Sequence, residues 1–285
     1  MNVTLDGLLA CLDLTEVDDG VLEGRNLEID YHRVFGGQIL AQVLVAAART
    51  SPTKSVKSLH VLFPREGDTA KPMRYEVRAL QEGRTFGTTE VIASQDGKVI
   101  AVAVASVHVD EPGLQRCDEP PSAGAPDDAE LVDLGMVPWE TRIAGGVDLG
   151  DRGVGEPVLD WWSRTPALEP DELVVHQALL AHATDLTIIG TALRPFDGFS
   201  QADSTVALQT AVTSHTLWFH QPFRADTWLQ LHQQSPVVAK GRAYGRGDVW
   251  SGEALVASFA QESMIRQTVW LVTAVSRATV ESACE

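Results

Sequence analysis

The sequence predicts an α+β fold in which a long buried helix followed by an antiparallel sheet occurs twice. Three observations predict it: two mostly apolar helical segments, several strand-like runs after each of them, and short sequence echoes between the two halves. A chain of 285 residues is long enough for two domains of about 100–150 residues each. We therefore expect an internal duplication.

The first half begins its regular structure at Gly36-Gly37, which fits a tight entry to a helix over 39–50. This segment is apolar on nearly every side and ends before Pro52, so the helix is expected to be buried. Strand-like runs separated by turn-forming residues follow it. They cover 59–63, 73–80, 85–94 and 98–109.

The second half repeats this order. A mostly apolar helix is expected over 171–189. The strand-like runs that follow it cover 206–219, 227–233, 239–250 and 254–264. Each half alone would leave one edge of its sheet unpaired, and two halves can cover each other's edges.

Local sequence similarity between the halves supports a duplication. The matching segments are QILA from Gln38 and QALL from Gln177, GRTFG from Gly83 and GRAYG from Gly241, and DGKVIA from Asp96 and SGEALV from Ser251. We expect a first unit over 1–110, a linker rich in Pro, Gly and acidic residues over 111–135, a second unit over 136–275, and a tail over 276–285.

The charge excludes several classes of function. The chain has 22 Lys and Arg against 39 Asp and Glu, a net charge of −17, which repels nucleic-acid backbones and anionic lipid. The N-terminus lacks the basic region of a signal peptide, and no apolar run reaches the length of a membrane span. Three widely spaced cysteines suit a reducing compartment. We therefore expect a cytoplasmic protein with no metal and no cofactor, and no nucleic-acid or membrane partner.

Two residues stand out because each is more polar than the residue aligned with it in the first half. The alignment of Gln38 with Gln177 places Asp185 opposite Ala46, and the later offset places Gln261 opposite Ser106. A buried carboxylate needs hydrogen-bond donors or must titrate, so both positions are candidate functional sites. Each residue also has a non-functional explanation. Asp185 could lie on the helix surface or in its last turn, and Gln261 could lie where its strand ends in solvent.

Five motifs in order resemble those of the acyl-CoA thioesterase II (TesB-like) family. They are VFGGQILAQVLVAAA from Val34, SLHVLFPREGD from Ser58, HQALLAHATDL from His176, HTLWFHQPF from His215 and LVASFAQESMIR from Leu255. The resemblance implies a double hotdog fold, meaning two tandem helix-and-sheet repeats. It also implies hydrolysis of acyl-CoA to a free fatty acid and coenzyme A.

The resemblance further implies that an Asp, a Ser or Thr, and a Gln hold the hydrolytic water. The Asp corresponds to Asp185 and the Gln to Gln261, whereas the hydroxyl position is occupied by Val212. On a regular strand Thr210 and Ser214 would share the face of Val212 and could replace the missing hydroxyl. Thr213 would be available only if a bulge shifted the register.

For the substrate we expect binding at Gly36 and Gly37, where absent side chains let a thioester approach backbone N–H groups, and at His60 and Arg65. The oxyanion would be stabilised by donors at a helix N-terminus. The phosphates of coenzyme A need local cations despite the overall charge. Arg84 and Arg242 are further candidates for them.

Two other functions remain open. One is an acyl-CoA-binding or regulatory protein with little or no turnover, because Val212 lacks a hydroxyl. The other is a hotdog enoyl-CoA hydratase, which needs an Asp and a His together, and only His182 lies at a helix position neighbouring Asp185. Apolar sheet edges and the family resemblance predict a homo-oligomer, a dimer or tetramer of double-hotdog protomers.

Overall fold

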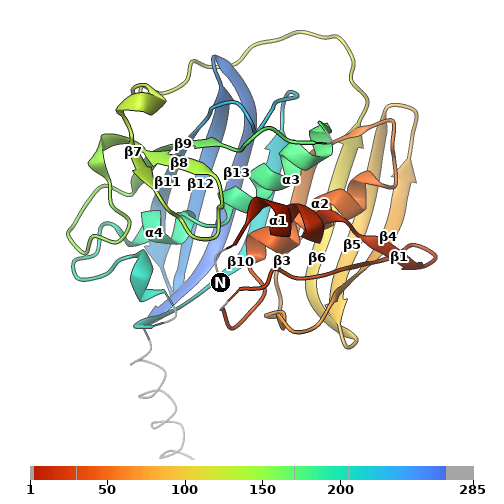
Figure 1. Ribbon diagram of the computed structural model, residues 1–285, viewed down its shortest axis with the longest axis horizontal. Helices are drawn as coiled ribbons and strands as arrows, with labels where there is room; N and C mark the ends of the chain where they lie inside the picture. The colour runs from red at the N-terminus through yellow and green to blue at the C-terminus, as the bar shows by residue number, and fades with distance from the viewer. Residues whose placement is uncertain (1–2, 30, 170, 205, 268–285) are drawn as a thin grey trace, which may run out of the picture.

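A single antiparallel sheet of 13 strands forms the body of the protein, ordered β1-β2-β4-β5-β6-β3-β10-β13-β12-β11-β9-β8-β7. The computed structural model describes residues 3–29, 31–169, 171–204 and 206–267, so the expected tail over 276–285 lies outside the described residues. In Figure 1 the sheet curves around the central helices, with the first half in red to yellow and the second in green to blue.

The first half holds one long buried helix and the strands around it. Its elements are α1 (Leu5–Leu12), β1 (Thr15–Asp18), β2 (Val21–Gly24), α2 (Gly36–Ala48), β3 (Ser55–Leu62), β4 (Met73–Glu82), β5 (Phe86–Gln95) and β6 (Lys98–His108). Ten of the 13 residues of α2 are buried, as its apolar sequence predicts. The strands β1 and β2 are short additions at the edge of the sheet that the sequence patterns did not predict.

The second half repeats this plan with extra elements. They are β7 (Glu130–Val132), β8 (Glu140–Ile143), β9 (Val158–Arg164), α3 (Leu173–Thr184), α4 (Ile188–Leu193), β10 (Leu208–Phe219), β11 (Leu229–Ala239), β12 (Arg242–Ser251) and β13 (Ala254–Gln267), with short 3-10 turns at Pro126–Asp128, Ala144–Gly146 and Gln201–Asp203. The strand β7 lies within the segment expected to be a linker. It pairs with β8 at the far edge of the sheet.

The two halves join through β3 and β10. Their pairing runs from Trp218 opposite Ser58 to Ser214 opposite Leu62, so the sheet is continuous. The helices α2 and α3 pack against each other on the concave face (Figure 1). The N-terminal end of α2 therefore meets the C-terminal end of α3, and this meeting point carries the candidate site.

The helix expected over 171–189 is two helices. Asp185 is the C-cap of α3, and the N–H of Leu186 donates to the carbonyl of Ala183, three residues back. The chain turns tightly there before α4 begins. The segment Leu173–Leu193 has the length and apolar composition of a membrane span, but 72% of its apolar 18-residue window is buried inside the protein, as expected of core helices.

Candidate active site

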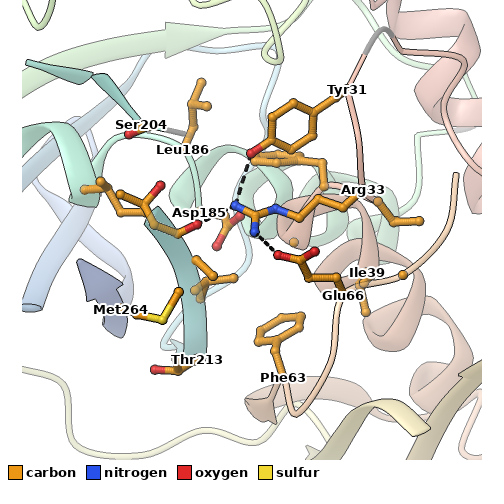
Figure 2. Close-up of a pocket in the computed structure, with 18 of the residues that line it drawn as sticks. Tyr31, Arg33, Ile39, Phe63, Glu66, Asp185, Leu186, Ser204, Thr213 and Met264 are labelled. Carbon is orange, nitrogen blue, oxygen red and sulfur yellow. Dashed lines mark hydrogen bonds and ion pairs between the residues drawn. The ribbon is translucent and has the colours of Figure 1, made fainter. Parts of the chain in front are cut away.

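A cavity of about 450 Å³ lies where the two halves meet. Its lining comes from the segment before α2, the start of α2, the loop after β3, the end of α3 and the middle of β10 (Figure 2). The lining includes Arg33, Gly36, Arg65, Asp185, Thr210, Val212 and Thr213. Because both halves contribute to the lining, the cavity forms only when β3 and β10 pair and join the halves in one sheet.

Asp185 is the buried carboxylate of this cavity and is only 6% exposed, whereas Glu66, which also lines it, is exposed. Burial raises its pKa to about 7, and the backbone N–H of Gly37 and the charge of Arg33 offset part of that effect. Its Oδ1 atom is buried and has no hydrogen-bond partner among the described residues. Such an oxygen needs a water or ligand donor, so Asp185 is poised to accept a proton near neutral pH.

The start of α2 approaches Asp185 closely because it lacks side chains. A Cβ at Gly36 would lie 2.8 Å from Asp185 Oδ2 and 2.8 Å from Val212 Cγ1. A Cβ at Gly37 would lie 2.3 Å from the carbonyl oxygen of His182. Two glycines are therefore what lets the N-terminus of α2 pack against the end of α3.

Gln261 lies on β13 directly opposite His215 on β10. The Nδ1 of His215 is 2.9 Å from Gln261 Oε1 and 4.0 Å from Asp185 Oδ1. The Nε2 of His215 lies 3.1 Å from Thr184 Oγ1 on the other side of the ring. Burial lowers the pKa of His215 to about 4, which keeps the ring neutral. His215 therefore lies between Gln261, which it bonds, and Asp185, both expected from the sequence.

A β-bulge at Thr213 changes which residues of β10 face inward. The pairing with β13 steps from Val212 opposite Ser263 to Ser214 opposite Glu262, leaving Thr213 as the extra residue. The buried positions shift from Leu208 and Thr210 before the bulge to His215, Leu217 and Phe219 after it.

This bulge corrects the expectation for Ser214. Ser214 does not share the face of Val212 and is not part of the cavity lining, because the inserted residue reverses the alternation. Thr210 does face inward, is 3% exposed and lines the cavity. Thr213 also lines it, with its hydroxyl donating to the carbonyl oxygen of Glu262 at 2.9 Å.

Of the expected substrate-binding side chains, Arg65 lines the cavity and donates to the carbonyl of Val99. His60 does not line it. Alternation along β3 turns Leu59 and Val61 inward, so the exposed His60 ring lies on the outer face against Trp218, with ring centroids 5.6 Å apart.

The two other candidate cations also lie away from the cavity. Arg84 is exposed in the turn between β4 and β5, and Arg242 pairs with Glu262.

Three further residues belong to the site: Arg33, which lies outside every quoted motif, and His215 and Ser263, which lie within two of the motifs but were not expected as site residues. Arg33 lies between Tyr31 and Glu66 at one side of the cavity (Figure 2), and it donates to the carbonyl of Thr210 at 2.6 Å. His215 and Ser263 are fully buried beside Gln261. Only their strand register shows that they belong here. Among the described residues no group of three or more His, Cys, Asp or Glu could hold a metal ion.

Comparisons with known proteins agree with this architecture. Residues 27–108 match the family model described as "Acyl-CoA thioesterase N-terminal domain", and residues 154–270 match the model "Acyl-CoA thioesterase". Acyl-CoA thioesterase 2 of Haemophilus influenzae is 32% identical, with 93% of this chain and 99% of the relative covered. Human acyl-coenzyme A thioesterase 8 is 30% identical, with 90% and 87% covered.

Solved structures of relatives have the same fold. The acyl-CoA thioesterase II TesB2 of Mycobacterium marinum is 34% identical and superposes with a TM-score of 0.78 over 91% of this chain and 98% of that one. The tesB protein of Mycobacterium avium subs paratuberculosis is 29% identical, with a TM-score of 0.79 over 92% and 99%. These matches confirm the double hotdog fold. The chain belongs to the acyl-CoA thioesterase family.

Proposed function

We propose that this protein hydrolyses acyl-CoA thioesters to free fatty acid and coenzyme A through a directly activated water. The observation that carries the proposal is Asp185, a buried carboxylate whose pKa is raised to about 7 and whose Oδ1 lacks a partner among the described residues. It faces the open N-terminus of α2. A base of this pKa is half ionised at neutral pH and matches general-base catalysis.

The start of α2 would bind the thioester carbonyl. The N–H groups of Gln38 and Ile39 are already bonded to the carbonyl of Phe35, while those of Gly36 and Gly37 come before the first intrahelical bonds. Donors at a helix N-terminus stabilise the oxyanion as it forms, with the helix dipole adding to the effect. The Gly37 N–H is shared with Asp185, so substrate and base would meet at one point.

The chemistry balances without a covalent intermediate. The water oxygen bonds to the carbonyl carbon while Asp185 takes the water's proton. The tetrahedral oxyanion then collapses, the C–S bond breaks, and the proton passes from Asp185 to the departing thiolate. The hydroxyl of Thr210 or Thr213 in the cavity lining would bind the water as well. Gln261 is buried behind this lining next to His215, and it would hold the water from the other side.

The remaining assignments concern the rest of the substrate and the assembly. Arg33 and Arg65 at the cavity would meet the coenzyme A portion. Leu62, Val104 and Trp218 are 60%, 38% and 39% exposed on neighbouring strands of the outer face, which supports a homo-oligomer through that face. A cytoplasmic role in fatty acid metabolism fits the substrate. The segment 111–135 would tether the units 1–110 and 136–275.

The central test is Asp185→Asn with a panel of acyl-CoA substrates that differ in chain length. We expect free thiol release by the wild type and a loss of about a hundredfold or more in kcat for the variant. Thr210→Val and Thr213→Val assign the hydroxyl. Full activity in Asp185→Asn would rule out Asp185 as the general base. If the wild-type protein bound acyl-CoA but released no thiol, an acyl-CoA-binding or regulatory function would be favoured instead.

The hydratase finds no support in this geometry. The Nε2 of His182 lies 2.7 Å from the carbonyl oxygen of Met136, and His182 is held there rather than paired with Asp185. Loss of enoyl absorbance with no thiol release would be its signature in the same assay.

A further inference from the structure

The carboxamide of Gln261 is held at both ends by buried side chains. His215 Nδ1 is hydrogen-bonded to Gln261 Oε1 at 2.9 Å, and Gln261 Nε2 donates to Ser263 Oγ at 2.8 Å. Gln261 is 1% exposed, and His215 and Ser263 are 0% exposed. A buried polar group of this kind needs its partners, because each unmade bond costs the desolvation of that group.

Strand register explains why Ser263 has this task. It lies two residues after Gln261 on β13, on the same inward face. Its neighbours across the sheet are Val212 on β10 and Ala243 on β12, and neither side chain can form a hydrogen bond. Gln261 is accordingly its hydrogen-bond partner among the described residues.

The orientation of the carboxamide matters because of what lies beside it. Asp185 Oδ1, which has no partner among the described residues, is 4.0 Å from the same His215 Nδ1 that bonds Gln261. The carboxamide and Asp185 are therefore neighbours through one ring atom, and the hydrogen bond from Gln261 Nε2 to Ser263 Oγ holds the other end of the carboxamide in place.

We propose that Ser263 is a positioning residue for hydrolysis, which holds the Gln261 carboxamide in its place beside His215 and Asp185. This rests on the proposed thioesterase function. The hydroxyl acts through Gln261 and does not contact the substrate. The position opposite it on β10 is Val212, so a hydroxyl placed there could take over the same hydrogen bond.

The test compares Ser263→Ala with Ser263→Cys and with the double variant Val212→Thr/Ser263→Ala in purified full-length protein. We expect Ser263→Ala and Ser263→Cys to lower kcat about tenfold to a hundredfold with KM unchanged, because a misplaced group costs rate rather than binding. Val212→Thr is also measured alone, because a hydroxyl in the cavity lining could act on the water directly. The Val212→Thr change should raise kcat more in the Ser263→Ala background than in the wild type. Ser258→Ala is the control, since Ser258 lies on the same strand, with its hydroxyl bonded to Asp248.

Each outcome decides between the inference and its alternatives. Wild-type kcat in Ser263→Ala overturns it, and so does a loss that Val212→Thr does not restore, which would indicate a packing role only. If Ser263→Ala does not fold, Ser263→Cys and its Val212→Thr partner decide in the same way. A wild-type protein that releases no thiol would instead contradict the proposed function, and the two failures are therefore distinct.

Discussion

At the scale of single residues, the site holds a carboxylate that the fold would be more stable without. The pKa of Asp185 is about 7 in the folded protein against 3.8 for the unperturbed group. Each unit of difference corresponds to about 1.4 kcal/mol, so ionising this group costs the folded state about 4 kcal/mol relative to the unfolded one. A buried base of this kind exchanges stability for reactivity.

The sign of this cost gives a stability prediction. Between pH 4 and pH 7 the unfolded chain has lost the Asp185 proton and the folded chain has kept it, so stability falls as the pH rises. Asp185→Asn should therefore raise the free energy of unfolding by about 2 kcal/mol or more at pH 8 and leave it nearly unchanged at pH 4. Chemical denaturation at both pH values measures this.

The exposed Asp197→Asn is the matched control and should change neither value. Equal effects of Asp185→Asn at pH 4 and pH 8 would contradict the raised pKa of Asp185 in the folded protein.

At the scale of elements, much of the architecture could be predicted from the sequence. The helix α2 and the strands β4, β5, β6, β12 and β13 follow apolar patterns that persist over ten or more residues. The two-residue turn at Asp96-Gly97 has positive φ values of 48° and 71°, as a tight hairpin requires. The edge strands β1, β2, β7 and β8 have three or four residues each, too few for alternation to be recognised.

The site itself could be predicted only in part, for a reason that lies in one strand. Asp185 and Gln261 were found because the two halves differ there. The bulge at Thr213 adds one residue to β10 without a glycine or proline to mark it, and it decides that His215 rather than Ser214 faces Gln261. The contacts of Gln261 with His215 across the sheet and of Arg33 with Thr210 depend on register and tertiary packing.

The N-terminus of α2 is the element whose geometry is most directly testable. In Gly36→Ala the new Cβ would need the space of Asp185 Oδ2 and Val212 Cγ1, both at 2.8 Å. We expect a loss of about a hundredfold in kcat/KM, because a displacement of about 1 Å at the reacting groups has this effect. Thiol release measures the loss, and circular dichroism checks that the variant is folded.

Gly113→Ala is the control, because nothing lies within 4 Å of a Cβ at that position and its rate should not change. Wild-type activity in Gly36→Ala would show that the thioester does not bind at the N-terminus of α2.

At the scale of the whole molecule, the duplication is symmetric in fold and asymmetric in chemistry. The alignment of Gln38 with Gln177 places Val175 and His176 of α3 where α2 has Gly36 and Gly37. Side chains at these positions close the approach that the glycines leave open. Together with Ala46 in place of a carboxylate, this supports one active site per chain, built from the helix N-terminus of the first half and the carboxylate of the second.

The net charge of −17 acts on the whole encounter between protein and substrate. Coenzyme A carries several phosphate charges, so the long-range field repels it, whereas the proposed contacts with Arg33 and Arg65 in the cavity lining would operate only at close range. The Debye length falls from about 30 Å at 0.01 M salt to about 10 Å at 0.1 M. Added salt therefore removes the repulsion before it weakens the local contacts.

We expect kcat/KM for a medium-chain acyl-CoA, kept below its micelle concentration, to rise roughly twofold to fivefold between 0.01 M and 0.1 M salt. The N-acetylcysteamine thioester of the same fatty acid has no phosphates, and its kcat/KM should stay constant. Steady-state thiol release over a salt series measures both. If kcat/KM for acyl-CoA fell with salt while the uncharged thioester did not change, local cations would dominate the encounter, and the overall acidity would have no influence on substrate capture.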